Sequence, residues 1–410
     1  MVKTIGILGP DLFLSSGGAI NHSINVMFDL KNDFKFIFFP NPYFINKYRK
    51  NKKIVNDKII MLSKFQITVP EIFIKALNNK ISWKEIINKY LNIHVDALFN
   101  FDYHFRIEIP DFSTIMSKRT GLKLGICLQG ISSYSIKFSS FLNRSIKLLI
   151  VSGNPMILIF SFYQYINLIR IIKRINKNKN IKIILTVNNE YYRNINIKNK
   201  EVKILYPGNG FINPNINNSN IKSDFQLCNV KKENKIIFFA RQSYIKGIFD
   251  LKPILKTMLK NNDFKFIIIG RFEHGFEEIL FKRIFSDYIK NGRIKYNGYV
   301  NDNELYREIA SSKVMIYPSH SDTYSIAILQ ALALKTMVVA YDIPGLSIYK
   351  NINAVRLVNE FDYNKMAHEA LSMIKIDNIE NVFDENTMKF IEEHNWHNVA
   401  NQYKKYFNSI

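Results

Sequence analysis

The stretch PSHSDTYSIAILQALALKTMVVAYD (residues 318–342) decides the fold, because a short loop, an apolar helix and a buried strand follow one another directly in it. The first backbone N–H groups of such a helix have no partner inside it, and the helix dipole adds positive charge at the same end. That end favours an anion. The stretch therefore predicts a sheet of buried strands with a ligand site at the loop before the helix.

The rest of the second half continues the alternation of strands and helices. Strands are expected at 235–242, 264–271, 293–300 and 313–319, and helices at 248–259, 276–289 and 301–312. Strands that alternate with helices of this length form a parallel sheet covered on both faces. The last stretch, 386–410, reads as a polar amphipathic helix.

The first half shows a similar pattern, with strands expected at 4–9, 34–40, 96–102, 122–130 and 182–189. Residues 201–220 are dense in Gly, Pro and Asn, which is typical of a linker. We therefore predict an N-terminal Rossmann-like domain at 1–205, a linker at 206–225, a second Rossmann-like domain at 226–385 and a closing helix at 386–410. Ligands bind beyond the carboxyl ends of such strands, so two facing domains would form a central cleft.

The amino-acid composition limits the classes of function that this protein can have. Of 410 residues, 47% are hydrophobic, which supports folded cores, and the net charge is +23. This charge favours nucleic acid, an anionic membrane or a phosphorylated substrate as partner, unless Lys is simply the common surface residue here. The two cysteines, Cys127 and Cys228, lie far apart, and no spacing typical of a metal site occurs. Because the N-terminus does not resemble a signal peptide, the expected location is cytoplasmic.

One apolar stretch leaves several interpretations open. Residues 148–169 carry no charge and are followed by the basic run RIIKRINKNKNIK. Its length would allow it to span a membrane, but Ser152 to Pro155 interrupt it early. We expect a helix over 156–176 that is buried in the core, lies in a membrane interface or spans the membrane.

Three loops carry candidate binding residues, and the first stands at the helix start. Asp322 is a good N-cap there, and the amides of Thr323 to Ile326 are expected to point out of the helix end. Gln330 lies two turns further on, and it would face a ligand only if the helix flanks the cleft. An ordinary helix cap and a surface glutamine are the structural alternatives.

The other two loops contribute cations and glycines. In ARQSYIKG (240–247), Arg241 and Lys246 beside an anion-binding helix suggest a diphosphate, although solvated surface cations are the alternative. In SSGG (15–18), the glycines let backbone amides approach a phosphate. Neither GxGxxG nor a Walker motif is present, which disfavours a dehydrogenase or a P-loop ATPase.

Together these motifs resemble the family 4 retaining glycosyltransferases, which have the GT-B fold. The Arg and Lys-Gly loop of that family is similar to ARQSYIKG, its Gly-ended strand to FIIIGR, its Gly-x-Val turn to NGYV (297–300), and its acidic helix motif to 318–342. Its Pro-Asn-Gly turn is similar to YPGNGFI (206–212), and its closing helix, which crosses back to the first domain, to HNWHNVANQYKKYF (394–407). The resemblance covers nearly all of 201–410 and is weaker over 1–200.

The resemblance implies a metal-independent retaining hexosyltransferase that needs no cofactor and uses a nucleotide diphosphate sugar, with UDP or GDP most favoured. Asp322 would hold sugar hydroxyls, and Arg241 and Lys246 would hold the phosphates. His104, with Asp102, would serve the acceptor. Tyr299 and Val300 would lie near the base and Gln330 near the ribose, within a set of donor contacts that comprises Gly17, Gly18, Gly270, Tyr299, Val300, Thr323, Tyr324, Ser325, Ile326 and Gln330.

The resemblance also implies a place in polysaccharide, glycolipid or glycoprotein glycan assembly, with a glycan or a lipid-linked molecule as acceptor. The apolar helix with its basic tail fits a peripheral enzyme at an anionic membrane, on the inner face of the cell membrane. A nucleic-acid partner is not expected, because the basic residues form no stripe interleaved with aromatics and no binding motif occurs.

Three departures from the family pattern keep alternatives open. The family's Glu-x7-Glu pair is Asp322 and Gln330 here, its His-Gly loop is Gln129-Gly130, and the serine before the linker is replaced by Asn188-Asn189. These changes bear on donor identity and on activity, and they leave the fold unaffected. A catalytically silent subunit that binds nucleotide sugar is the main alternative. A sugar-nucleotide epimerase of the same fold would lack the Lys-Gly and closing-helix motifs.

Overall fold

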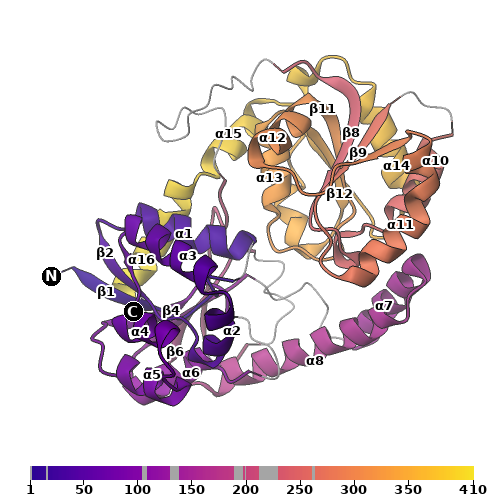
Figure 1. Ribbon diagram of the computed structural model, residues 1–410. Coiled ribbons are helices and arrows are strands. Elements are labelled where there is room, and N and C mark those ends of the chain that lie inside the picture. The colour runs from indigo at the N-terminus through magenta and orange to yellow at the C-terminus, as the bar shows by residue number, and fades with distance from the viewer. Residues whose placement is uncertain are drawn as a thin grey trace. The chain divides into compact units, whose positions relative to one another are not determined.

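The computed structural model describes residues 2–14, 17–103, 109–129, 138–188, 197–198, 200–211, 230–260 and 264–410. The chain divides into two units. The first comprises Met1–Ile131, Ile166–Gly210 and Trp396–Ile410, and the second comprises Ser132–Tyr165 and Phe211–Asn395. Each unit is an α/β structure built on one parallel sheet (Figure 1).

A seven-stranded parallel sheet forms the centre of the first unit. Its order is β3-β2-β1-β4-β5-β6-β7. The order reverses between β1 and β4, so the loops after these two strands meet at a crevice where doubly wound sheets bind ligands. The strands are β1 (Lys3–Ile7), β2 (Phe34–Phe38), β3 (Ile67–Thr68), β4 (Ala97–Asn100), β5 (Leu124–Leu128), β6 (Ile181–Thr186) and β7 (Glu201–Ile204).

Helices cover this sheet, and the last helix of the chain is one of them. Tyr403 and Phe407 of that helix are fully buried, and the Phe407 ring packs edge-on against Phe34 and Phe99 of the sheet. The C-terminal helix therefore completes the core of the first unit. The helices are α1 (Gly18–Asp29), α2 (Ile45–Lys50), α3 (Lys52–Lys64), α4 (Glu71–Asn78), α5 (Trp83–Tyr90), α6 (Phe112–Thr120) and α16 (Trp396–Ser409).

The second unit repeats the same topology with the order β10-β9-β8-β11-β12-β13. Its strands are β8 (Glu233–Phe239), β9 (Lys265–Ile269), β10 (Ile294–Tyr296), β11 (Ser312–Tyr317), β12 (Met337–Tyr341) and β13 (Val355–Val358). The order reverses between β8 and β11, so the loops that follow them, 240–247 and 318–325, meet at one crevice. The strand order therefore explains why the two loops that carry the predicted motifs lie beside each other.

The helices within residues 230–395 of the second unit confirm the predicted alternation. They are α10 (Leu251–Met258), α11 (Gly275–Lys290), α12 (Asp302–Ser311), α13 (Ile326–Ala333), α14 (Tyr363–Ile374) and α15 (Glu385–Glu393). Strand β12 and the last four residues of β8 and of β11 are buried and apolar, as expected for a parallel sheet between two helical layers.

The division of the chain differs from the predicted bounds, because residues 138–165 group with the second unit. This segment contains α7 (Phe138–Ser152) and the first half of α8 (Met156–Lys177). Arg144 of α7 lies 2.8 Å from Glu360, and Phe160 of α8 stacks on His274 at 5.5 Å between ring centroids. These contacts are long-range in sequence, so local patterns could not reveal them.

The segments around the predicted linker and closing helix also differ. Residues 201–204 form β7, and positions 212–225 of the linker lie outside the described residues. The helix expected over 386–410 is two helices, α15 and α16, which belong to different units. The break falls at His394, whose ring is buried and bonds the Phe390 carbonyl and the Tyr324 hydroxyl, each at 2.6 Å.

Candidate functional site

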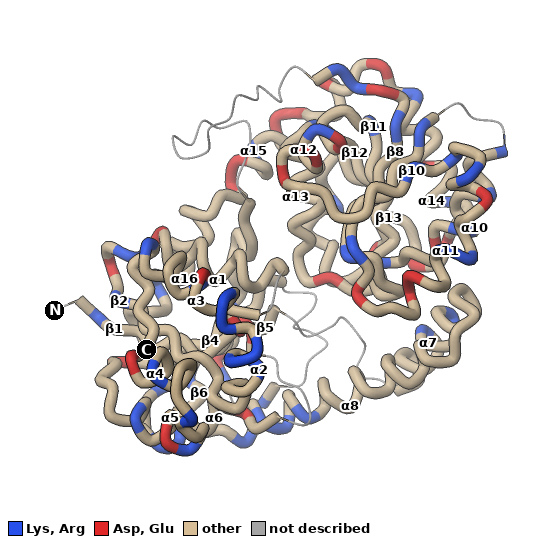
Figure 2. Tube along the Cα trace, in the orientation of Figure 1, with Lys and Arg blue, Asp and Glu red and all other residues tan. Residues whose placement is uncertain are grey.

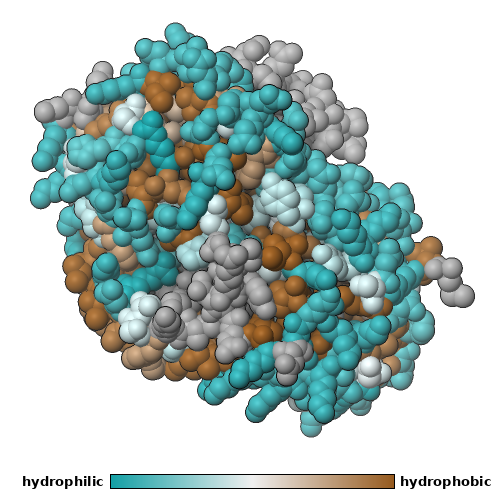
Figure 3. All heavy atoms as spheres, turned by 180° about the vertical axis from the view of Figure 1, so that it is seen from behind, coloured by the Kyte–Doolittle hydropathy of each residue, from teal (hydrophilic) through white to brown (hydrophobic). Residues whose placement is uncertain are grey.

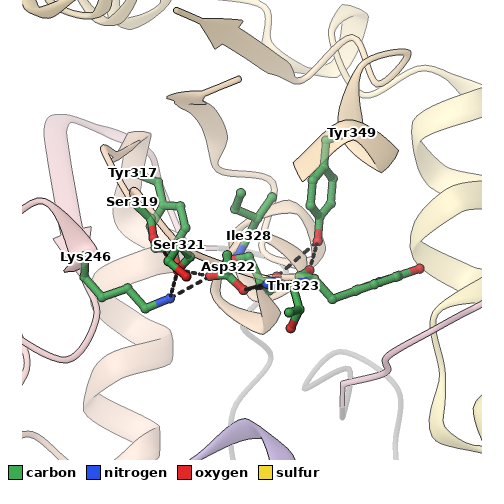
Figure 4. Close-up of polar contacts among 10 residues, drawn as sticks. Lys246, Tyr317, Ser319, Ser321, Asp322, Thr323, Ile328 and Tyr349 are labelled. Carbon is green, nitrogen blue, oxygen red and sulfur yellow. Dashed lines mark hydrogen bonds and ion pairs between the residues drawn. The ribbon is translucent and has the colours of Figure 1, made fainter. Parts of the chain in front are cut away.

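Asp322 organises the loop between β11 and α13 (Figure 4). Its Oδ1 accepts hydrogen bonds from the backbone N–H groups of Thr323, Tyr324 and Ser325 at 2.9, 3.2 and 2.9 Å. The prediction that these three amides point freely out of the helix end is therefore wrong, because the carboxylate folds back onto them. A carboxylate that accepts several backbone N–H bonds is strongly stabilised in its charged form.

The cap of α13 is Ser325 and not Asp322. Its hydroxyl accepts from the Ile328 amide at 3.3 Å, and its backbone is left-handed, with φ 39°. The Tyr349 hydroxyl holds this turn by donating to the carbonyl oxygen of Ser325 at 3.1 Å (Figure 4). The first helical N–H groups, on Ile326 and Ala327, have no acceptor within the helix, so the positive helix end lies one residue beyond Ser325.

Lys246 forms an ion pair with Asp322, with Nζ 2.8 Å from Oδ2 and with side chains only 15% and 12% exposed. The Tyr317 hydroxyl donates to the same Oδ2 at 2.5 Å, and Nζ also donates to the Ser321 carbonyl at 3.0 Å (Figure 4). Burial lowers the pKa of Lys246, but the Asp322 carboxylate outweighs it and raises that pKa above its usual value. Burial raises the pKa of Asp322, but Lys246 lowers it to about 2. Both groups are charged at neutral pH.

Two glycines allow the loops of this ion pair to pack closely. A Cβ at Gly345 would lie 1.7 Å from the carbonyl oxygen of Asp322. At Gly247, which has φ 76°, a Cβ would lie 2.0 Å from the carbonyl oxygen of Pro318. Because real Cβ atoms do not approach backbone this closely, the loop of Lys246 can pack on the Asp322 loop only with glycine at 247, and the segment 344–349 can do so only with glycine at 345.

The second predicted cation, Arg241, is exposed and pairs with Glu273 at 2.9 Å. The loop that carries it is fixed by Glu277, a buried residue that the sequence analysis missed. The carboxylate of Glu277 accepts from the amides of Tyr244 at 2.8 Å and His274 at 3.0 Å. Burial raises the pKa of Glu277 to about 7, although these two hydrogen bonds oppose the shift. Glu277 thus ties the loop 240–247 to the start of α11.

His320 was also missed, since a histidine between two serines gives no sign of its partners. It is fully buried, with Nε2 2.9 Å from Asp250 and Nδ1 2.7 Å from Glu360. Its backbone N–H donates to the Ile245 carbonyl at 2.8 Å, next to Lys246. Burial lowers the pKa of His320, but the two carboxylates outweigh it and raise the pKa to about 9. His320 is a positioning residue for both loops.

The residues predicted near the base lie at the end of β9. Gly270 has φ 139°, and a Cβ there would lie 1.8 Å from the carbonyl oxygen of Ala240. Its N–H donates to the Gly298 carbonyl at 2.7 Å, which brings the turn with Tyr299 and Val300 beside it. The Tyr299 ring is exposed and lies under the guanidinium of Arg271. Gln330 is half-buried and lies near the hydroxyl of Tyr306 on α12.

In the first unit, the predicted glycines begin a helix. Gly17 is the N-cap of α1 with φ 131°, and Gly18 is the first helical residue; both are exposed. Asp102 follows β4, which neighbours β1 at the switch point of the sheet. His104, predicted to serve the acceptor, lies outside the described residues.

A buried histidine in α1 has a structural role. His22 lies 3.1 Å from Asn209 through Nδ1 and 2.8 Å from the Tyr403 hydroxyl through Nε2. Burial lowers its pKa to about 4, so it is neutral at pH 7. The contact with Tyr403 joins α1 to α16. Among the described residues, no group of three or more His, Cys, Asp or Glu could hold a metal ion.

Comparison with known proteins bears on the class of fold. Residues 220–390 match the family described as glycosyl transferases group 1. No curated protein matches the chain. Three similar solved structures are a glycosyltransferase from Rickettsia africae ESF-5 (TM-score 0.64, 18% identity, covering 99% of this chain and 98% of that chain), Anabaena Alr3699/HepE in complex with UDP (0.65, 13%, 100% and 100%), and sucrose-phosphate synthase from Thermosynechococcus elongatus (0.63, 11%, 99% and 98%).

At these identities the solved structures show the fold alone, and they show it over nearly the whole chain. Two parallel-sheet units and these neighbours establish the GT-B fold, which confirms the predicted fold class. The segment 220–390, which is less than half of the chain, is similar to the group 1 glycosyltransferases.

Proposed function

We propose that this protein transfers a hexose-type sugar from a nucleotide diphosphate to a glycan or lipid-linked acceptor, with retention of the anomeric configuration. The observation that carries the proposal is the charged pair of Lys246 and Asp322 beside the start of α13, at the switch point of the second sheet. The group 1 family match supports it, as do GT-B neighbours solved with UDP and with UDP-glucose. We take a uridine nucleotide as the favoured donor.

In this proposal the diphosphate binds between Lys246, Arg241 and the first N–H groups of α13, while the backbone amides at Gly17 and Gly18 are further contacts. The surface pair of Arg241 with Glu273 contributes little energy, so Arg241 is free to turn toward a phosphate. As the glycosidic C–O bond to the diphosphate breaks, the two cations stabilise the growing negative charge. No metal and no cofactor is needed, because Arg and Lys supply the positive charge.

The sugar and the base have separate contacts. Asp322 accepts hydrogen bonds from sugar hydroxyls through its remaining lone pairs, helped by the turn of Thr323 to Ile326. The base lies against Tyr299 and Val300, near Gly270. Gln330 reaches the ribose.

Retention follows from attack on the same face of the sugar that the diphosphate leaves. The acceptor hydroxyl attacks an oxocarbenium-like carbon, a new C–O bond forms, and a phosphate oxygen of the leaving group takes the hydroxyl proton. His104, with Asp102, is proposed to orient the acceptor. Assembly of a polysaccharide, glycolipid or glycoprotein glycan, on the cytoplasmic face of an anionic membrane, fits the net charge of +23.

A catalytically silent subunit that binds nucleotide sugar is the second candidate. One observation favours it: both oxygens of Asp322 are engaged, Oδ1 by three amides and Oδ2 by Lys246 and Tyr317. A carboxylate so occupied has little capacity left for sugar hydroxyls.

A thermal-shift screen with UDP, GDP, ADP and nucleotide sugars tests the donor site. A nucleotide at 100-fold above its dissociation constant adds about 2.7 kcal/mol to the free energy of unfolding. We expect one nucleotide to stabilise the protein, and Arg241→Ala to weaken the effect while the exposed cation variant Arg293→Ala leaves it unchanged. Stabilisation by no nucleotide would contradict the proposal. Binding without release of nucleotide from the sugar donor, across lipid and glycan acceptors, would favour the silent subunit.

A further inference from the structure

The helix α7 has one exposed apolar face and one buried face. Phe138, Leu142, Ile146 and Ile150 recur every four residues, and each is more than a third exposed, with Ile150 at 73%. The adjacent face, with Phe141 and Leu148 among others, is buried. An amphipathic helix in a soluble protein normally turns its apolar side inward, so an apolar stripe on the outside indicates an interaction surface.

The first half of α8 continues this exposed apolar surface. Met156, Ile159 and Phe162 follow one another at helical spacing and are exposed, with Ile159 at 61%. Beneath them, Ile157 and Ser161 are fully buried. Figure 3 shows hydrophobic atoms gathered along the lower left edge, where α7 and the start of α8 lie.

The exposed face of α8 changes from apolar to basic along its length. Beyond Ile166, the positions at the same helical spacing are Arg170, Lys173 and Lys177, and all three are exposed. No acidic residue occurs between Asp111 and Glu190 in the sequence. Figure 2 shows the same change, with α7 and the first turns of α8 mainly tan and the far end of α8 blue.

Contacts on the inner sides hold this surface in place. Arg144 of α7 pairs with Glu360, and Phe160 of α8 stacks on His274 and Phe276 at 5.5 and 5.7 Å between ring centroids. Among the described residues, α8 is the one helix long and apolar enough to cross a membrane, and 33% of its most apolar window is buried inside the protein. A helix fixed in this way can lie along a lipid surface, whereas crossing would strip these contacts from its inner face.

We propose that the exposed residues of α7 and α8, which we call the α7–α8 face, dock this protein on an anionic membrane surface. The apolar side chains enter the boundary between headgroups and acyl chains, and the three cations contact acidic headgroups. Charge complementarity selects this occupant, because three exposed cations lie on α8 and the sequence from Phe112 to Asn189 holds no acidic residue. This inference rests on the proposed function, because a lipid-linked acceptor would lie in a membrane. It adds to that function the surface by which the protein reaches such an acceptor.

Vesicle flotation at moderate salt tests the α7–α8 face. We expect the protein to float with vesicles of phosphatidylglycerol and phosphatidylcholine and to stay behind with phosphatidylcholine alone. Arg170→Gln with Lys173→Gln should lower the partition coefficient roughly 25-fold, because each cation near such a surface contributes roughly five-fold. The matched control is Lys252→Gln with Lys256→Gln, two exposed lysines of α10, which should bind as the wild type does.

The apolar part is tested by Ile150→Asp with Ile159→Asp. Binding should fall at least about ten-fold, whereas Ile279→Asp, at a site 71% exposed on α11, should leave it unchanged. No flotation with anionic vesicles, or equal loss in the controls, overturns the proposal. A dimer in sedimentation that Ile150→Asp dissolves, without lipid binding, would instead assign the face to a second copy. Nucleotide stabilisation is measured in parallel, so a failure of the donor site is seen separately from a failure of docking.

Discussion

Replacing Asp322 by Asn removes one negative charge at the centre of the loop while nearly conserving its shape. Lys246 Nζ lies 2.8 Å from the carboxylate, and both side chains are largely buried. Removing one partner of a buried ion pair leaves the other charge uncompensated and costs about 3–5 kcal/mol. Asn can still accept the three amide hydrogen bonds through its Oδ1, so we expect a loss near the lower end, about 3 kcal/mol.

Urea unfolding at pH 7 measures this loss when it is followed by two probes. Both tryptophans, Trp83 and Trp396, lie in the first unit, so their fluorescence reports that unit, whereas far-UV circular dichroism reports both. With a slope of about 2 kcal/mol per molar urea, a loss of 3 kcal/mol moves a midpoint by about 1.5 M. The shift should appear in circular dichroism more strongly than in fluorescence.

The matched control is Glu380→Gln, which breaks the surface pair with Lys335 at 2.7 Å and should cost no more than about 1 kcal/mol. If Asp322→Asn shifts the dichroism midpoint no further than this control, the pair does not hold the loop and the reasoning fails.

The pH dependence of stability gives a second check. Because the pKa of Asp322 is lowered to about 2, its contribution to stability is present above the unfolded value of 3.8 and is lost as pH falls through about 2.

Three further outcomes are expected. The pKa of His320 is raised to about 9, so its contribution to stability is present below the unfolded value of 6.5 and is lost as pH rises through about 9. Wild-type stability measured by urea unfolding should therefore fall between pH 7 and 10. A His320→Gln variant whose stability falls equally over that pH range would contradict this assignment. Gly270→Ala should cost at least about 3 kcal/mol, because it combines a left-handed φ with a clash against Ala240, whereas Gly275→Ala, which meets no atom within 4 Å, should be close to neutral in the same melts. Arg241→Ala should change stability by less than about 1 kcal/mol, since its pair is exposed, yet calorimetry should show roughly ten-fold weaker binding of the nucleotide diphosphate; equal affinity would remove Arg241 from the proposed donor site.

The alternation of strands and helices over 235–342 could be predicted because each element carries its own period and its own turn residues. The loops 240–247 and 318–325 meet because their strands are neighbours in the sheet. This strand order is predictable because β-α-β units have one handedness. The state of Asp322 could not be predicted in the same way. Spacing placed it at the helix start, but its carboxylate bonds to its own loop and to Lys246, which is 76 residues away.

The missed residues share one property. Glu277, His320 and His22 are buried polar side chains that each have a partner distant in sequence, although Glu277 also accepts from the nearby His274 amide, and a single sequence gives no sign of the distant pairs. The grouping of 138–165 with the second unit was missed for the same reason, because Arg144 pairs with Glu360 across more than two hundred residues. Local patterns reveal the elements, whereas the polar contacts that lock the elements together become visible only in three dimensions.

The place of α16 has a consequence for the order in which the protein is made. Tyr403 and Phe407 fill the core of the first unit, and Lys3 at its first strand bonds the carbonyl oxygens of Phe407 and Ile410. A ribosome that adds about 5–20 residues per second needs roughly ten to forty seconds to make the second unit before it reaches these side chains. During that time the nascent first unit exposes an unfilled hydrophobic groove, which makes it a client for chaperones until the last helix emerges.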